Sequence, residues 1–347
     1  MIRPRATAPL LLLLGACQAG GGDTDATTTT ADTSTSTSGQ VSSTTTGTGE
    51  PTTTGTTTTT GTGEPTTTGT TTGTTDPDET TDTDGAAPIV VEGLSVPESI
   101  LHDVAADVYL ISNINGTPTA TDDNGFISRV LPDGTVDQLA FIDGADPEVT
   151  LDAPKGMAIV GDFLYVSDIT VVRKFDRTTG APLATIAIDG AGFLNDLSAD
   201  ASGNVYVGDM QVEAIHVINP ADEPTLLFES SDLQNPNGLL ADDQGVHVVT
   251  NGGTKLLYVP RQMPVVMELF DLEASSLDGL APHPAGGWLV SSWETSAVYH
   301  VSADLQTAAV VVADISSPAD IGVDTGRERV LIPVFTENRA EFHLLAP

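Results

Sequence analysis

Six short segments of the chain carry residues of similar type at nearly equal intervals. Five of them are Pro97-Glu98, Pro154-Lys155-Gly156, Leu194-Asn195-Asp196, Pro236-Asn237-Gly238 and Leu277-Asp278-Gly279, and the sixth is Pro318-Ala319-Asp320. From Lys155 onward, successive segments are 40, 42, 41 and 41 residues apart. If the segments occupy equivalent places around one axis, two carboxylates, two carboxamides and one ammonium group converge there. That set of groups has the composition of a cation site.

The candidate metal ligands are the four oxygen-bearing residues of this ring, Glu98, Asn195, Asn237 and Asp278. Hard oxygen ligands with a formal charge of −2 suit Ca²⁺ and leave positions for water or substrate. No His or Cys occupies a ring position, which argues against a tetrahedral zinc site. The alternative is that Asn-Asp and Asn-Gly are ordinary turn formers and that Glu98 simply follows a proline. Four oxygen-bearing residues at equivalent positions favour the cation site.

The interval between the segments is the length of a four-stranded propeller blade. Each repeat contains short β-branched or aromatic runs that are separated by Gly, Asp and Asn turns, as antiparallel strands require. In the third repeat we expect strands at Asp196–Asp200, Asn204–Gly208, Glu213–Ile218 and Thr225–Glu229. The sequence therefore predicts an all-β fold, a six-bladed β-propeller of four-stranded antiparallel blades.

The sixth repeat lacks an outer strand, because the chain stops after Glu341–Leu345. Pro88–Glu92 precedes the first repeat and has no partner of its own. Placing it as the outer strand of the sixth blade closes the circle without a covalent link and removes an exposed edge.

Two connections in the first repeat are longer than their counterparts. The step from Glu98 to Lys155 is 57 residues, and the excess falls in Ile114–Gly125 and Asp143–Ala153. Strand order puts both connections on the same face as the ring, where they are candidate lids or substrate-contacting loops.

The N-terminal residues read as a targeting signal and a tether. Arg3 and Arg5 precede the apolar run Pro9 to Leu14, and Leu14-Gly15-Ala16-Cys17 has the form of a bacterial lipobox. Residues 1–17 are expected to be a lipoprotein signal ending at lipidated Cys17; the alternative is a secretory signal with an incidental cysteine. Residues 18–86 are mostly Thr, Gly, Ser, Asp and Glu, which predicts a disordered linker. Residues 87–347 form the folded domain.

Charge and cysteine content limit the partners of that domain. The chain carries −36, and residues 87–347 contain 38 acids and 10 bases, which is about −28. Nucleic acid and anionic membrane surfaces are therefore poor partners. Cys17 is the only cysteine, so no disulfide closes the ring. We expect a monomer that touches the membrane only through its lipid anchor in the cell envelope. Gln18 after the cysteine favours the outer membrane.

The ring motifs resemble the metal-ligand motifs of the gluconolactonase and regucalcin (senescence marker protein) family in order and spacing. They are Pro97-Glu98, Leu194-Asn195-Asp196, Pro236-Asn237-Gly238-Leu239 and Leu277-Asp278-Gly279. Asn124-Gly125-Phe126-Ile127 and Ala153-Pro154-Lys155-Gly156-Met157 resemble a bacterial branch of that family. The resemblance implies a six-bladed propeller that binds a calcium-like ion and hydrolyses lactones or phosphotriesters. It implies that Glu98, Asn195, Asn237 and Asp278 are the ligands and that Asp278 is also the base or nucleophile.

Three further aspartates, Asp168, Asp196 and Asp209, would orient the amide ligands or make turn and strand-end hydrogen bonds.

Two residues depart from the family pattern. Sugar-acid lactonases of this family resemble one another in an arginine two residues before the first asparagine, where this chain has Phe193. An apolar acyl group is therefore expected in place of a sugar-acid carboxylate. Lys155 is the second candidate catalytic residue. Three roles stay open for it: neutralising Glu98 or Asp278, binding an anionic substrate group, or pointing outward.

These observations predict a divalent-cation-dependent hydrolase of lactones or related esters, most simply with Ca²⁺ and a small-molecule substrate. The alternative is a non-catalytic cell-envelope scaffold that displays one face to a protein or glycan. Whether Asp278 faces an open pocket separates the two.

Overall fold

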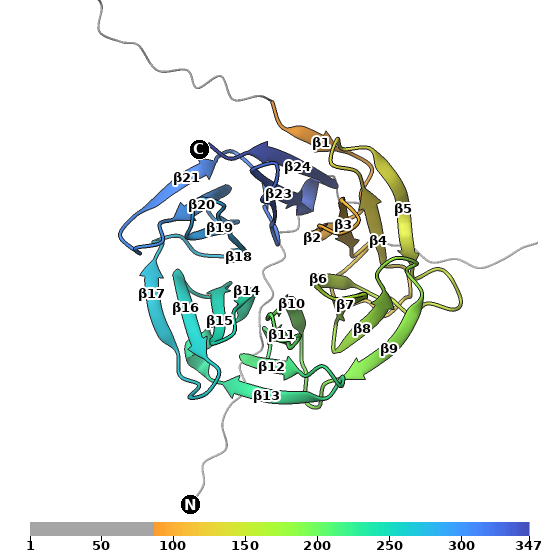
Figure 1. The fold of residues 1–347 in the computed structure, drawn as a ribbon, viewed down its shortest axis with the longest axis horizontal. Coiled ribbons are helices and arrows are strands. Elements are labelled where there is room, and N and C mark those ends of the chain that lie inside the picture. The colour runs from red at the N-terminus through yellow and green to blue at the C-terminus, as the bar shows by residue number, and fades with distance from the viewer. Residues whose placement is uncertain (1–86, 347) are drawn as a thin grey trace, which may run out of the picture. The chain divides into compact units, whose positions relative to one another are not determined.

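The computed structural model describes residues 87–346. Cys17, the lipoprotein signal and the linker expected over residues 18–86 lie outside the described residues. Residues 87–346 form six four-stranded antiparallel sheets arranged as blades around a common axis (Figure 1), which confirms the all-β, six-bladed propeller.

Each blade contains consecutive strands, from the axis to the rim, except the last. Blade one is β2 (Pro97–Asp103), β3 (Val108–Asn113), β4 (Phe126–Val130) and β5 (Val136–Asp143); blade two is β6 (Pro154–Val160), β7 (Phe163–Asp168), β8 (Val171–Asp176) and β9 (Pro182–Ala187); blade three is β10 (Leu194–Ala199), β11 (Val205–Asp209), β12 (Ala214–Ile218) and β13 (Pro224–Glu229). Blade four is β14 (Pro236–Ala241), β15 (Gly245–Thr250), β16 (Lys255–Pro260) and β17 (Met267–Asp271); blade five is β18 (Leu277–Pro282), β19 (Trp288–Ser292), β20 (Ala297–Val301) and β21 (Ala308–Val312); blade six is β22 (Gly322–Asp324), β23 (Arg329–Val334), β24 (Arg339–Leu344) and β1 (Ile89–Val91).

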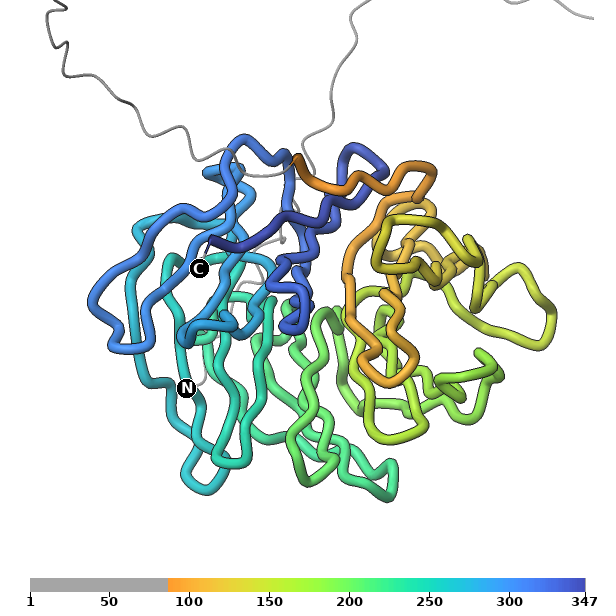
Figure 2. The backbone as a smooth tube through the Cα atoms, turned by 45° about the horizontal axis from the view of Figure 1, so that its top comes forward, coloured from red at the N-terminus to blue at the C-terminus, as the bar shows by residue number. Residues whose placement is uncertain are grey.

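The N-terminal strand completes the last blade, as predicted. β1 pairs antiparallel with β24, with Ile89 opposite Phe342 and Val91 opposite Ala340. Figures 1 and 2 show this orange strand alongside the dark blue end of the chain. Val91 and Leu94 are buried in one apolar cluster with Phe342 and with side chains of blade one. The closing strand therefore also joins the sixth blade to the first.

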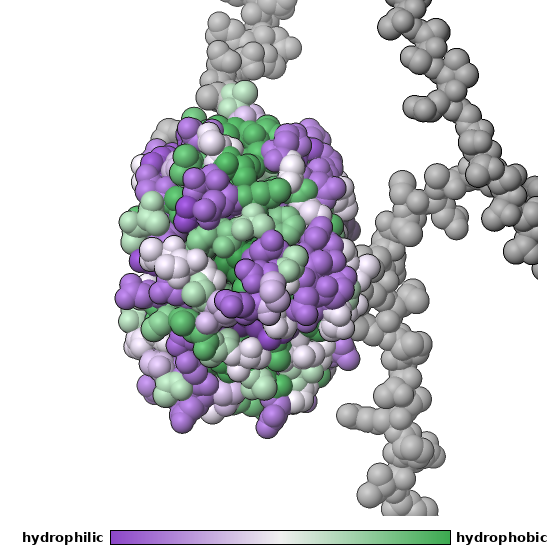
Figure 3. All heavy atoms as spheres, turned by 90° about the vertical axis from the view of Figure 1, so that its right-hand side faces the viewer, coloured by the Kyte–Doolittle hydropathy of each residue, from purple (hydrophilic) through white to green (hydrophobic). Residues whose placement is uncertain are grey.

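The hydrophobic cores lie between neighbouring blades. One cluster, for example, combines Tyr165 and Val172 of blade two with Leu197 and Val205 of blade three. Middle strands are consequently buried on both faces, and every residue of β11 and β12 is buried. The outer strands face solvent. β5 and β9 expose apolar side chains, and Figure 3 shows that side of the molecule with hydrophobic and hydrophilic residues interspersed.

The sixth inner strand is shorter than the other five. β22 has three residues, and the segment before it makes only two isolated bridges, Pro318 with Val334 and Asp320 with Ser99. The sixth segment thus lies beside β2 of blade one and belongs only partly to its own sheet.

The two long connections of blade one, residues 114–125 and 144–153, hydrogen-bond to each other. The Gly125 amide donates to Leu151 O (3.0 Å), and the Gly144 amide donates to Gly125 O (2.9 Å). A Cβ on Gly125 would lie 2.3 Å from Pro154 Cδ, so only glycine fits this crossing. The two loops form one packed unit beside the start of β6.

Within residues 87–346, no helix is long and apolar enough to cross a membrane.

The first prediction tests closure. A truncation that begins at residue 95 removes β1 together with the buried Val91 and Leu94, and we expect it to cost about 3–6 kcal/mol of unfolding free energy. A truncation that begins at residue 85 keeps β1 and should melt at the wild-type temperature. The measurement is thermal and urea unfolding of both proteins. Equal stabilities would show that β1 does not close the ring.

Candidate metal centre

The five ring residues stand at the same irregularity in five inner strands. In β2, Pro97 pairs with Asn113 and Ile100 with Ile111, so that Glu98 and Ser99 together face the single residue Ser112. The register shifts in the same way at Lys155-Gly156, Asn195-Asp196, Asn237-Gly238 and Asp278-Gly279. A β-bulge of this kind redirects a side chain out of the regular alternation. The bulges are what turn the ring side chains toward the axis.

Close approach of neighbouring blades explains the residues at the second position of each bulge. A Cβ on Gly238 would lie 2.2 Å from Asp278 O of the next blade, and one on Gly279 would lie 2.2 Å from Ile321 N. Three bulges therefore carry glycine. The other two carry Ser99 and Asp196, which make hydrogen bonds between blades. Ser99 Oγ donates to Asp320, which precedes β22 of blade six, and Asp196 accepts from the Leu239 amide of blade four.

Buried serines opposite the bulges complete their hydrogen bonding. Ser112 Oγ accepts from the Ser99 amide at 2.9 Å. Ser291 Oγ accepts from the Gly279 amide at 2.7 Å and donates to Ala319 O at 2.9 Å. Ser167 Oγ donates to Asn195 O. These serines were not predicted from the sequence, although they recur one residue before the end of the second strands.

Three of the four expected ligands present an unused oxygen. Glu98 Oε2, Asn195 Oδ1 and Asp278 Oδ1 are buried and have no hydrogen-bond partner. An unpaired buried polar atom costs about 1–3 kcal/mol, so native proteins rarely keep several together without a ligand. The residues fit a hard cation, which would satisfy these oxygens at once.

Hydrogen bonds of the two asparagine amides leave the oxygen of Asn195 free and occupy that of Asn237. The Asn195 amide nitrogen lies 3.2 Å from Met210 Sδ and also donates to Asn237 Oδ1. The Asn237 amide nitrogen donates to Leu277 O at 3.3 Å. Because the nitrogens are engaged with the protein, Asn195 keeps its oxygen for a ligand.

The ring carboxylates repel one another. Burial, followed by Asp278 and Asp320, raises the pKa of Glu98 well above its ordinary value, and Lys155 opposes that rise. Burial and Asp320 raise the pKa of Asp278 in the same way. The site therefore destabilises its own ionised form when no cation is present.

Lys155 is buried and does not point outward, which excludes one of its three expected roles. It is 1% exposed; Nζ donates to Ala153 O at 2.9 Å and lies 4.6 Å from the centre of the Phe193 ring. Burial lowers the pKa of Lys155 to about 8, while Glu98 and Asp168 favour its charged form. The Phe193 ring thus packs against the ammonium group of Lys155.

The three supporting aspartates bind backbone amides rather than the ring asparagines. Asp168 accepts from the Ala153 amide (2.8 Å) and from Arg173. Asp209 accepts from the Gly192 and Phe193 amides. Asp196 accepts from the Leu197 and Leu239 amides. These are turn, strand-end and interblade hydrogen bonds, the structural alternative stated above for this group.

Trp293 lies beside Asp278. No hydrogen bond satisfies its buried indole N–H, but this group lies near enough to the Asp278 carboxyl to oppose the rise in pKa that burial and Asp320 cause. The Trp293 ring lies 5.1 Å from that of Phe335 in blade six. Within residues 87–346 there is no metal-binding cluster of three or more His, Cys, Asp or Glu side chains. The ring is of another kind, with two carboxylates and two amides.

Comparison with known proteins supports this fold. No protein-family model and no curated protein matches the chain. Among solved structures, the chain resembles a gluconolactonase from Xanthomonas campestris, with a TM-score of 0.60 and 15% identity over 75% of this chain and 92% of that one. It also resembles the calcium-binding protein regucalcin from Agrobacterium tumefaciens, with a TM-score of 0.55 and 16% identity over 75% and 94% of the two chains.

A third similar structure is a chain of the nidogen–laminin complex, with a TM-score of 0.51 and 17% identity over 65% of this chain and 91% of that one. At these identities the likeness concerns the fold. The fold is the one that the resemblance to gluconolactonases and regucalcin implied.

The second prediction concerns pH and the metal-free protein. Because the folded pKa values of Glu98 and Asp278 lie above the ordinary 4.5 and 3.8, the folded state holds more protons than the unfolded chain above about pH 4. In the presence of a chelator, the free energy of unfolding should therefore fall as pH rises from 5 to 8. Glu98→Gln should flatten this slope, whereas Glu148→Gln, at an exposed acid, should not. Urea unfolding at pH 5 and pH 8 measures the free energy of unfolding of each protein. The same pH dependence in the wild type and in Glu98→Gln would contradict the prediction.

Proposed function

We propose that this protein is a divalent-cation-dependent hydrolase of lactones or related esters, with Glu98, Asn195, Asn237 and Asp278 as ligands. The observation that supports this most directly is the convergence of three unpaired buried oxygens at equivalent bulges of three blades. The gluconolactonase and the calcium-binding regucalcin of similar fold support the substrate class and the ion. A bound Ca²⁺ would supply polarisation of a substrate carbonyl oxygen.

Asp278 is the proposed base or nucleophile. Its Oδ1 has no partner, and the indole N–H of Trp293 lies beside the carboxyl. In its ionised form Asp278 accepts a proton from the attacking water or attacks the acyl carbon directly. Phe193 presents an aromatic face in place of the family arginine, which suits an apolar acyl group better than a sugar-acid carboxylate.

We also propose that the enzyme is monomeric and held at the cell envelope through lipidated Cys17, with the outer membrane as its site. The lipobox and the residue after the cysteine support this assignment.

A non-catalytic scaffold is the second candidate. Two observations favour it: Asp278 is 6% exposed, and the nidogen–laminin complex contains a chain of similar fold. The two candidates differ in whether cation binding is coupled to turnover.

The third prediction concerns the cation. Calorimetric titration should detect Ca²⁺ binding with preference over Mg²⁺, because the larger ion accepts irregular oxygen geometry. The melting temperature should rise with Ca²⁺ by mass action. Asp278→Asn should lower hydrolysis of a lactone and ester panel about 100-fold or more and Ca²⁺ affinity only about 10-fold, since an amide still ligates but is no base.

The exposed Asp243→Asn is the matched control for the loss of one charge and should behave as wild type. If the wild-type protein takes up no divalent ion at millimolar concentration, the hydrolase proposal fails. If it binds Ca²⁺ but hydrolyses nothing in the panel, the scaffold is the better assignment.

The fourth prediction concerns Lys155. Its ammonium is near Glu98 but bound to Ala153 O and the Phe193 ring, so we expect it to reduce cation affinity rather than to bind substrate. Lys155→Met, which keeps the buried stem, should tighten Ca²⁺ about 10-fold. Lys255→Met, at a lysine on an outer part of blade four, should leave Ca²⁺ affinity unchanged. A higher KM for anionic substrates without tighter Ca²⁺ binding would instead assign Lys155 to substrate recognition.

A further inference from the structure

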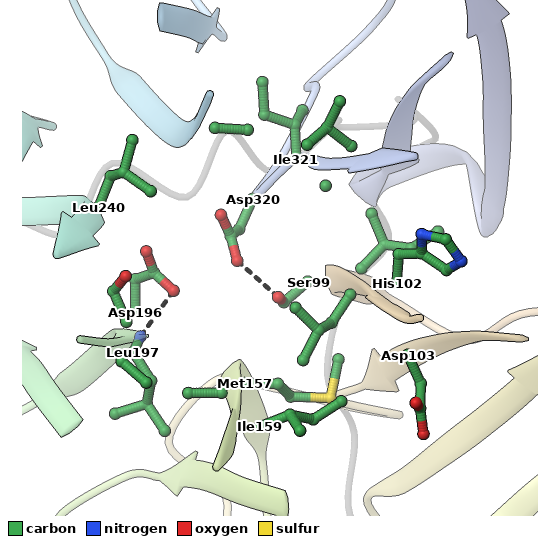
Figure 4. A pocket seen from close by; sticks show the side chains of 18 of the residues that line it. Ser99, His102, Asp103, Met157, Ile159, Asp196, Leu197, Leu240, Asp320 and Ile321 are labelled. Carbon is green, nitrogen blue, oxygen red and sulfur yellow. Dashed lines mark hydrogen bonds between the residues drawn. The ribbon is translucent and has the colours of Figure 1, made fainter. Parts of the chain in front are cut away.

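The central channel has a second compartment, on the opposite side of the ring from the strand starts. A cavity of about 530 Å³ is lined by residues that follow the ring positions in all six inner strands, and it reaches the turns at their far ends (Figure 4). None of the four expected ligands lines this cavity. It is therefore distinct from the candidate metal centre, and its size is that of a small-molecule site.

The walls of this cavity are hydrocarbon. Each blade contributes an aliphatic or thioether side chain to them, among them Ile100, Met157, Leu197, Leu240, Leu280 and Ile321. Such walls favour the hydrocarbon part of a ligand over a hydrated ion.

The floor of the cavity carries two carboxyl groups. Asp196 and Asp320 are 4% and 8% exposed, and Figure 4 shows their side chains turned toward each other across the channel. Both Asp196 oxygens accept backbone amides, from Leu197 and Leu239, each at 2.6 Å. Asp320 Oδ2 accepts from Ser99 Oγ at 2.5 Å. The Asp320 carboxyl also hydrogen-bonds to the Asp196 carboxyl, so the two acids form a pair at the floor of the cavity.

No basic side chain of the cavity neutralises this floor. Arg177 Nη1 lies 2.9 Å from Asp103, and His102 Nε2 lies 3.5 Å from Asp107. None of the ion pairs in the described part of the chain includes Asp196 or Asp320. The acid pair at the base of an apolar cavity is thus left without a basic partner, and burial raises the pKa of both carboxyls. The net charge of the domain, about −28, attracts cations.

We propose that this cavity binds an organic ammonium ion, a protonated amine carried on a compact hydrocarbon body. The ammonium group donates to the acid pair of Asp196 and Asp320, and the hydrocarbon packs against the walls. An inorganic cation fits poorly, because Ca²⁺ takes about six to eight oxygen ligands and most of this cavity is lined by hydrocarbon. The site uses none of the four ligands proposed for the ring.

Methionine methyl groups report on the two sites separately in the full chain. Met157 lines the cavity, Met210 Sδ lies 3.2 Å from Asn195 at the ring, and Met263 and Met267 are exposed on blade four. With ¹³C-methyl-methionine labelling, n-hexylammonium should shift the Met157 signal and leave Met263 and Met267 unchanged. It should bind at least 10-fold more tightly than 1-hexanol, and hexanoate should not bind. Absence of a Met157 shift at millimolar hexylammonium, or equal affinity for hexanol, would overturn the proposal.

A charge-removing variant tests the floor directly. Asp320→Asn keeps the acceptor for Ser99 and should weaken hexylammonium at least 10-fold while leaving hexanol unchanged; Asp243→Asn removes the same charge from the exposed surface and should change neither. An equal effect of both variants would refute the assignment. If Asp320→Asn does not fold, the wild-type comparison of hexylammonium with hexanol decides.

Ca²⁺ alone should shift Met210 and not Met157, so a failure of the ring proposal and a failure of this one give different spectra. A shift of the Met157 signal by Ca²⁺ alone would show that the cavity takes an inorganic cation and would overturn the proposal.

Discussion

The crowding of six inner strands around one axis is the constraint on which the rest of this structure depends. Neighbouring blades approach so closely at the strand starts that a single added Cβ on Gly238 or Gly279 would meet backbone atoms at 2.2 Å. Regular pairing stops there, and five of the six inner strands form a bulge at the same place. The polar side chains at the bulges therefore converge because of the way the ring packs.

The same crowding creates the chemical character of the site. Buried serines and backbone carbonyls take up the donors that the bulges leave free, and amide nitrogens bind to neighbouring groups. What remains are buried oxygen atoms without hydrogen-bond partners. A protein keeps such an arrangement at a cost to its own stability, and a cation that binds there recovers that free energy. Stability and ligand binding are thus linked through the same few atoms.

Much of the fold follows from local pattern. The four strands expected in the third repeat agree within about two residues with β10 to β13, and Pro88–Glu92 contains β1. The repeat spacing was enough to predict that Glu98, Asn195, Asn237 and Asp278 lie close together, because equivalent positions of the blades lie on one circle around the axis.

The details that decide the chemistry depend on contacts between blades. Spacing alone does not reveal the register shift that redirects Glu98, the packing of Lys155 on Phe193, or the pairing of Asp320 with Asp196. A serine recurs one position before the end of the second strand in three blades, as Ser112, Ser167 and Ser291. This recurrence could have predicted the bulges from the sequence. The sixth inner strand departs from the repeat because Asp320 pairs with Ser99 of blade one.

The position of β1 also determines how the domain carries mechanical load. The chain enters the fold at β1, and β1 is held to β24 by a ladder of three residue pairs, without a covalent link. Tension applied through the N-terminal segment therefore reaches this short ladder before any other strand. A sustained pull would therefore load these three residue pairs first, whereas the five bulges near the axis are held within their own blades.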